Sequence, residues 1–170
     1  MPVGPTIRHE RPTPRDILRV TICDTDETLA AASNLFNEYR HQYGEPPDAD
    51  ERALGWITEM VESNMLTVYT ASVEAPTDAL PIGLATSHAT PASLMMGRFW
   101  QLRDLYVVPG FRRRGVAAAM VNEVRVAALA AGATRISLVT EHDNQAALGL
   151  YRRLGFRPVE GLTSLSLDLA

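Results

Sequence analysis

The sequence predicts a mixed α/β fold in which one mixed sheet of about six to seven strands carries helices on both faces. Three strand-like stretches follow one another with short loops between them, at residues 66–73, 82–88 and 99–108, and this order predicts an antiparallel meander. The third stretch leads through a helix, at about residues 115–131, to an apolar stretch near residues 135–141. A strand–helix–strand unit of this length predicts a parallel pair with a right-handed crossover.

The first half of the chain begins with residues 1–16, which contain four prolines and predict a flexible arm ahead of a single domain at residues 17–170. Residues 17–23 predict a first strand. A helix is expected from Asp24, which has a glutamate three residues later as in a capping box, to a stop at Gly44.

A second helix is expected from Asp48, with Glu51 at its third position, to Asn64. Residues 75–81 predict a hairpin loop before the strand at residues 82–88. Residues 90–97 predict a second loop before the strand at residues 99–108.

The last elements follow the predicted parallel pair. Asn144 is expected to cap a helix that Gly155 stops, with Phe156 packing back and Pro158 preventing continuation. Three leucines then alternate with polar residues, at Leu165, Leu167 and Leu169, which predicts a half-buried final strand.

Composition excludes several functional classes. The net charge is -4 and the isoelectric point about 5.5, whereas nucleic-acid-binding domains usually carry a basic excess. Cys23 is the only cysteine, so an intrachain disulfide and a cysteine-based metal cluster are excluded, and a reducing cytoplasm fits. The longest apolar region, residues 116–133, is interrupted by Asn122, Glu123 and Arg125, which argues against a membrane span.

An anion site is expected where the strand at residues 99–108 meets the following helix. The connection contains a Pro109-Gly110 turn, three consecutive arginines and Gly115. A helix start leaves backbone N–H groups without intrahelical partners, and its dipole favours negative charge. An ordinary turn with a solvated charge run is the alternative, and these residues alone do not separate the two.

Two motifs resemble the GCN5-related N-acetyltransferase family. The pattern Arg112-x-x-Gly115-x-Ala117 resembles the family's acetyl-coenzyme A loop, Arg/Gln-x-x-Gly-x-Gly/Ala. The stretch NQAALGLYRRLGF resembles a second motif, through Asn144, Tyr151 and the final glycine–phenylalanine pair. The resemblance spans about residues 18–169. Arg113 departs from it, because many members carry glycine there.

The resemblance implies a fold of this family and an acetyl-coenzyme A site. Backbone N–H groups of the loop would hold the pyrophosphate, and the preceding strand would pair with the pantetheine arm. A backbone N–H near Tyr106 or Val107 would stabilise the oxyanion, and Asn144 would contact the pantetheine or cap its helix. The implied cofactor-binding residues are Leu105, Tyr106, Val107, Arg112, Arg113, Arg114, Gly115, Val116, Ala117, Asn144 and Tyr151; no metal ligand is expected.

Catalysis requires an acid and a way to deprotonate the acceptor amine. Tyr151, with a reference pKa of roughly 10, is expected to donate a proton to the departing thiolate, the alternative being a core tyrosine. An alkyl amine is almost entirely protonated at pH 7, so a base or a water chain is needed. Asp104 and Glu141 are the leading candidates for this base, and His88 and His142 are further candidates. Each of the four is equally explained as a surface charge or as a structural partner of an arginine.

The acceptor pocket is expected in the first half of the chain. Aromatic side chains form its candidate walls, although aromatic residues at helical spacing are more often core. They are Tyr39, Tyr43, Trp56 and either Phe99 or Trp100.

The expected function is transfer of acetyl from acetyl-coenzyme A to a primary amine, by direct attack in a ternary complex. A small-molecule amine is favoured over a protein or peptide amine. Two alternatives come from other functional classes. A non-catalytic acyl-coenzyme A sensor is disfavoured by the presence of Tyr151, and a nucleic-acid-binding protein is disfavoured by the negative net charge. No nucleic-acid or membrane partner is expected. Family members are often dimers, so a homodimer is an expectation, to which the last strand would contribute.

Overall fold

The computed structural model describes residues 17–74 and 79–169. The predicted N-terminal arm and most of the hairpin loop at residues 75–81 lie outside the described residues. The chain divides into two compact units, the first ending at Leu138 and the second beginning at Val139.

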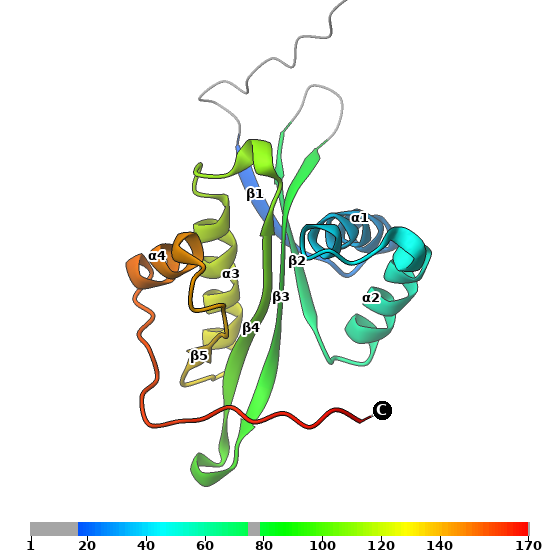
Figure 1. Ribbon diagram of the computed structural model, residues 1–170. Helices are drawn as coiled ribbons and strands as arrows, with labels where there is room; N and C mark the ends of the chain where they lie inside the picture. The colour runs from blue at the N-terminus through cyan, green and yellow to red at the C-terminus, as the bar shows by residue number, and fades with distance from the viewer. Residues whose placement is uncertain (1–16, 75–78, 170) are drawn as a thin grey trace, which may run out of the picture. The chain divides into compact units, whose positions relative to one another are not determined.

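The first unit contains one mixed sheet whose strands follow sequence order (Figure 1). Strands β1 to β4 are antiparallel neighbours, and β5 runs parallel to β4. This arrangement confirms the predicted meander and parallel pair. The strand count was predicted too high, because the described residues contain five. They are β1 (Leu18–Ile22), β2 (Thr67–Val73), β3 (Leu80–Ala92), β4 (Gly97–Val107) and β5 (Ile136–Ser137).

A bulge interrupts the long β3–β4 pair near its middle. Thr86 lies opposite Asp104 and Ser87 opposite Leu102, so Arg103 is an extra residue on β4. A bulge of this kind bends its strand and re-aims the side chains beside it. On the far side of the bulge, β3 and β4 extend further than predicted, and the connecting loop shortens to the 3-10 turn η2 (Ser93–Met95).

Helices cover both faces of the sheet within this unit (Figure 1). The helices α1 (Asp26–Gln42) and α2 (Ala53–Glu62) pack on one face, where Leu84 of β3 and Tyr106 of β4 join Leu29 and Ile57 in the buried core. The helix α3 (Val116–Ala130) packs on the other face. There a side chain on Gly83 would meet the methyl end of Met120 at 2.8 Å, so glycine permits the close approach of helix and strand.

Two helix starts differ from the prediction. Thr25, not Asp24, is the N-cap of α1, and it forms a reciprocal capping box with Thr28. Asp48 does not cap α2, because residues Pro47–Arg52 form the 3-10 turn η1 before the helix begins at Ala53. Consecutive prolines fix the backbone ahead of this turn. The predicted ends are confirmed, since Gly44 and Asn64 take left-handed conformations just past the two helices.

The second unit contains the helix α4 (Gln145–Arg153). The Asn144 side chain accepts a hydrogen bond from the Ala147 N–H at 3.1 Å, which confirms the predicted cap. Gly155 follows in a left-handed conformation, with φ of 92°. The Phe156 N–H then donates to the Tyr151 carbonyl at 3.0 Å, and the two rings meet edge to face at 5.7 Å between centroids.

The predicted final strand is wrong, because residues 160–169 take no strand conformation. Leu165, Leu167 and Leu169 are 84–92% exposed, and an alternating pattern forms a strand only where a neighbouring edge pairs with its backbone. The stretch at residues 135–141 is likewise shorter than predicted, because β5 ends at Ser137 and Val139 is 86% exposed.

Candidate functional site

The connection from β4 to α3 places two loop residues in left-handed backbone conformations. The 3-10 turn η3 (Pro109–Phe111) follows β4. Arg113 and Gly115 then both take left-handed conformations, with φ of 65° and 85°. Glycine adopts this region readily, whereas a residue with a Cβ does so at a cost. The structure therefore gives a physical reason why glycine is suited to the position that Arg113 occupies.

The start of α3 is open to an anion. Gly115 is its N-cap and no side chain caps it, in contrast to α1 and α4, which Thr25 and Asn144 cap. Uncapped N–H groups at a helix start, together with the helix dipole, favour a bound phosphate. A Cβ on Gly115 would meet nothing within 4 Å, so the space beside this turn is open.

The three arginines of the loop differ in what they contact. Arg112 Nε donates to the Val107 carbonyl at 2.9 Å, and its Nη2 donates to Gln42 Oε1 at 2.6 Å. Its side chain therefore ties the end of β4 to the end of α1. The Arg114 guanidinium lies 5.4 Å from the Phe111 ring centroid, a cation–π contact. Arg113 makes no hydrogen bond or ion pair within the described part of the chain.

The strand β4 presents polar side chains to the face covered by α1 and α2. Residues directly opposite each other on antiparallel strands share a face, so Tyr106 and Asp104 lie on the same face as Leu84 and Thr86. The Tyr106 hydroxyl donates to Glu38 Oε2 of α1 at 3.0 Å. Burial, followed by the hydrogen bond and negative charge of Glu38, raises the pKa of Tyr106 to about 12. Tyr106 therefore remains a hydrogen-bond donor at neutral pH.

Asp104 and His88 stand nearer the bulge on that face. The Thr86 hydroxyl donates to the Asp104 carboxylate. His88 lies two residues beyond Thr86 on β3, opposite Gln101. Its Nδ1 is buried and has no hydrogen-bond partner in the described residues. Burial, aided by the positive charge of Arg103, lowers the pKa of His88, while Asp104 opposes the shift. A neutral histidine and a carboxylate thus lie on one sheet face.

The predicted aromatic walls form a connected group across α1, α2 and β4. The Tyr39 ring lies 5.1 Å from Tyr43 and 6.1 Å from Tyr106 between centroids. Phe36 lies 6.3 Å from Tyr39 and stacks on Trp56 at 5.2 Å. Trp56 and Tyr43 are 41% and 55% exposed, so this group reaches the surface of the α1–α2 side.

The other two predicted wall residues lie elsewhere. Trp100 is buried on the α3 face, where its indole N–H donates to Ser87 Oγ at 2.9 Å. Phe99 is covered by the guanidinium of Arg135, 3.8 Å from the ring centroid.

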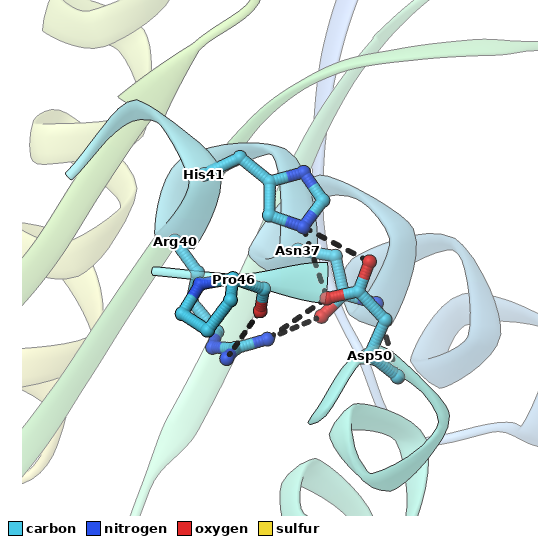
Figure 2. A network of polar contacts seen from close by, with 5 residues as sticks. All are labelled: Asn37, Arg40, His41, Pro46 and Asp50. Carbon is cyan, nitrogen blue, oxygen red and sulfur yellow. Dashed lines mark hydrogen bonds and ion pairs between the residues drawn. The ribbon is translucent and has the colours of Figure 1, made fainter. Parts of the chain in front are cut away.

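A polar network fixes η1 against the end of α1 (Figure 2). Arg40 Nη1 and His41 Nε2 each lie 2.9 Å from a carboxylate oxygen of Asp50. The Asn37 side-chain amide donates to the Asp50 carbonyl at 3.1 Å. These contacts hold η1, the segment that connects α1 to α2. Trp56 lies in the first turn of α2, just after this segment.

Four predicted site residues belong to the second unit. Tyr151 is half-buried and contacts Phe156, and the Asn144 side chain caps α4. Glu141 is exposed, and its carboxylate accepts from the Thr140 hydroxyl at 3.5 Å. His142 is also exposed. Cys23 of the first unit is 1% exposed, and burial raises its thiol pKa, so this thiol is poorly suited to act as a nucleophile.

Two polar residues of α1 are not predicted by the sequence. Glu38 contacts Tyr106 of β4, and Gln42 contacts Arg112 of the loop. Neither belongs to the two motifs, and each looks like an ordinary polar residue on a helix. Separately, no group of three metal-ligating side chains occurs among the described residues. None of the described helices has the length and apolar character to cross a membrane.

Comparison with known proteins supports the same family. The model of the acetyltransferase (GNAT) family matches residues 29–156, which include both motifs and reach into both units. An uncharacterized N-acetyltransferase of Bacillus subtilis (strain 168), YhfO, is 29% identical over 140 residues, which cover 82% of this chain and 91% of the relative.

Solved structures share the fold. The crystal structure of a probable acetyltransferase has a TM-score of 0.80 and 25% identity, covering 89% of this chain and 98% of its own. The aminoglycoside N-acetyltransferase AAC(6')-Iy in complex with CoA has a TM-score of 0.75 and 20% identity, covering 92% and 99%. The chain therefore belongs to the GNAT family of acetyltransferases, enzymes that use acetyl-coenzyme A as the acetyl donor.

Proposed function

We propose that this protein transfers the acetyl group of acetyl-coenzyme A to a primary amine of a small molecule, by direct attack in a ternary complex. The observation that carries this proposal is the uncapped start of α3, which follows β4 through η3 and the arginine loop, at the family's cofactor-loop motif. Next to it, β4 and α1 present Asp104 and Glu38 on one side of the sheet. A donor site for phosphates thus adjoins carboxylates suited to an amine.

The proposed donor site uses the loop and strand in different ways. Backbone N–H groups from Arg112 to Ala117 hold the pyrophosphate, and the side chain of Arg112 keeps the loop attached to β4 and α1. The backbone of Leu105, Tyr106 and Val107 aligns the thioester, and an N–H near Tyr106 or Val107 stabilises the oxyanion. Asn144 contacts the pantetheine while capping α4.

The proposed chemistry takes two protons from the acceptor nitrogen, one before attack and one, lost to solvent water, as the tetrahedral intermediate collapses, and it gives one proton to the departing sulfur. A base removes the proton of the acceptor ammonium before attack. The candidates are Asp104, which precedes Leu105 on β4, and Glu141. Tyr151 protonates the thiolate of coenzyme A as the tetrahedral intermediate collapses. A phenol with a reference pKa of roughly 10 carries its proton at neutral pH, so it is available as an acid.

A small-molecule acceptor is favoured by two observations. Relatives with this fold include aminoglycoside N-acetyltransferases, and the carboxylates and aromatic rings on the α1–α2 side suit a compact cation. A protein or peptide amine is the second candidate, since a ribosomal-protein-alanine N-acetyltransferase also shares the fold. A cytoplasmic location is proposed because the single buried thiol of Cys23 fits a reducing compartment.

Replacing Tyr151 by phenylalanine tests the proposed acid. We expect the variant to lose about tenfold or more of kcat while its KM for acetyl-coenzyme A changes little, since general acid catalysis contributes roughly 10²–10⁴-fold. Release of free thiol with a panel of small amines measures turnover. The variant Tyr69→Phe removes a buried phenol hydroxyl from the α3 face of the sheet, outside the proposed site, and is the matched control.

The same assay separates the alternatives. Unchanged turnover in Tyr151→Phe would remove this residue from the mechanism. If the wild-type protein binds acetyl-coenzyme A but acetylates no small amine and no peptide, the chain is an acyl-coenzyme A sensor instead. Turnover on peptides alone would move the acceptor to the protein class.

A homodimer is also proposed, with residues 162–169 as its contact. Leu162, Leu165, Leu167 and Leu169 are 79–92% exposed and alternate in part with serine, the pattern of a strand that needs a neighbour on one face. A second copy of the chain is the proposed occupant, because residues 162–169, which form no strand in this structure, would gain a partner for their backbone and cover their leucines on dimerisation.

A further inference from the structure

Glu38 is a surface carboxylate that is hydrogen-bonded to β4, the strand whose backbone is proposed to align the thioester. Its Oε2 accepts a hydrogen bond from the Tyr106 hydroxyl at 3.0 Å, across a sequence separation of 68 residues. Tyr106 is 6% exposed, whereas Glu38 is exposed. The buried phenol therefore fixes the position of a carboxylate that solvent reaches, on the α1–α2 side of β4.

No cation neutralises this carboxylate within the described residues. The nearby arginines have other partners: Arg40 pairs with Asp50, and Arg112 donates to Gln42 and the Val107 carbonyl. Asp104 lies on the same face of β4 two residues away and is also held by a neutral hydroxyl, that of Thr86. The two negative charges, Asp104 on β4 and Glu38 next to it, attract a ligand cation.

A chain of aromatic rings leads from Tyr106, which holds Glu38, toward the surface. The Tyr39 ring lies 6.1 Å from Tyr106 and 5.1 Å from Tyr43 between centroids, and Tyr43 is 55% exposed. Organic ammonium groups bind well where a carboxylate stands beside aromatic faces, because charge and ring quadrupole both favour the cation. The combination is more specific than an acidic side chain alone.

We propose that Glu38, positioned by Tyr106, binds a positively charged group of the acceptor other than the amine that receives acetyl. The enzyme then selects acceptors with at least two amino groups. The reacting amine is an unsuitable partner for Glu38, because an adjacent carboxylate favours the protonated form, whereas attack requires the neutral amine. This inference rests on the proposed function and assigns the acceptor class of the same site.

Matched amines test the assignment. We compare kcat/KM for 1,4-diaminobutane and butylamine, and for 1,6-diaminohexane and hexylamine, in the wild type and in Glu38→Gln. Glutamine keeps a carbonyl oxygen for the Tyr106 hydroxyl but loses the charge. The diamine-to-monoamine ratio is expected to fall about tenfold or more, as loss of a hydrogen bond to a charged group implies. Glu62→Gln, which removes one charge from the exposed end of α2, leaves the ratio unchanged.

Tyr106→Phe tests the positioning role. It removes the hydrogen bond and leaves Glu38 charged, so the ratio is expected to fall in the same direction by a smaller factor, through KM for the diamine. A purely structural role of Tyr106 would lower turnover of both amines alike. Because β4 also carries the proposed donor site, the KM for acetyl-coenzyme A is measured in the same variant.

Binding gives a readout that needs no turnover. Isothermal titration of the diamines into the protein saturated with coenzyme A is expected to show weaker binding to Glu38→Gln than to wild type. Equal binding and an unchanged ratio overturn the inference. An equal fall in kcat for both amines makes Glu38 a base and also overturns it. Failure of the wild type to acetylate any amine defeats the proposed function instead, while titration still decides whether Glu38 binds a cation.

Discussion

His88 is a neutral side chain on the sheet face that carries Asp104. Burial and the charge of Arg103 lower its pKa, and Asp104 opposes them only in part. Its Nδ1 has no hydrogen-bond partner in the described residues, so protonation in the folded state gains no acceptor there. Protonation of His88 is therefore expected to be less favourable in the folded chain than in the unfolded chain.

The lowered pKa predicts a loss of stability in mild acid. The unfolded chain binds a proton at its reference pKa of roughly 6.5, while the folded chain binds it only at lower pH. The contribution of His88 is thus present above about pH 6.5 and is lost as the pH falls toward the folded pKa. Urea unfolding between about pH 5 and 8 should show a steeper decline in the wild type than in His88→Gln. Parallel curves would contradict the prediction.

At the scale of elements, the α3 face of the sheet depends on a buried hydroxyl. Ser87 Oγ of β3 accepts from the indole N–H of Trp100 on β4 at 2.9 Å, and lies 3.3 Å from the Tyr69 hydroxyl of β2. Ser87 is fully buried, Tyr69 is 1% exposed and Trp100 8%. One small side chain therefore joins three strands where water does not reach.

Ser87→Ala is predicted to destabilise the protein by about 1–3 kcal/mol, because the indole N–H would remain buried without a partner. Chemical denaturation of the variant measures the loss. Ser72→Ala on β2 is the comparison, since Ser72 makes no side-chain hydrogen bond in the described residues, and its effect should stay within about 0.5 kcal/mol. A similar effect of both substitutions would show that the hydrogen bonds of Ser87 with Trp100 and Tyr69 do not stabilise the sheet.

The helix boundaries show how far local patterns reach. Asn144 and Gly155 were correctly expected at the ends of α4, because a cap and a left-handed stop depend on neighbouring residues alone. The start of α1 was placed at Asp24, whereas Thr25 caps it together with Thr28. Several short polar residues in a row satisfy the same local rule, and only backbone geometry chooses among them.

At the scale of the whole molecule, exposed leucines near the C-terminus predict self-association. Leu165 and Leu167 are 90% and 84% exposed. The double substitution Leu165→Ser and Leu167→Ser is expected to shift the protein from dimer to monomer in sedimentation velocity, because it removes the apolar face of the proposed contact.

The control for that experiment is the double substitution Leu94→Ser and Met96→Ser in the β3–β4 connection, whose side chains are 103% and 97% exposed. It removes comparable apolar surface from another place and should leave the dimer intact. A wild-type protein that sediments as a monomer at micromolar concentration would refute the proposed homodimer directly.

The meander, the parallel crossover and the strand–turn–helix with its arginines could be predicted from the sequence, because each depends on hydrophobic period and turn residues that act locally. The bulge at Arg103, the contacts of Arg112 with β4 and α1, and the hydrogen bond from Tyr106 to Glu38 could not be predicted in this way. These join residues far apart in the chain, and their geometry follows from how α1 packs on the sheet. The backbone path of the proposed donor loop could therefore be predicted from its motif, whereas the side chains of the proposed acceptor site could be identified only from the packing of α1 on β4.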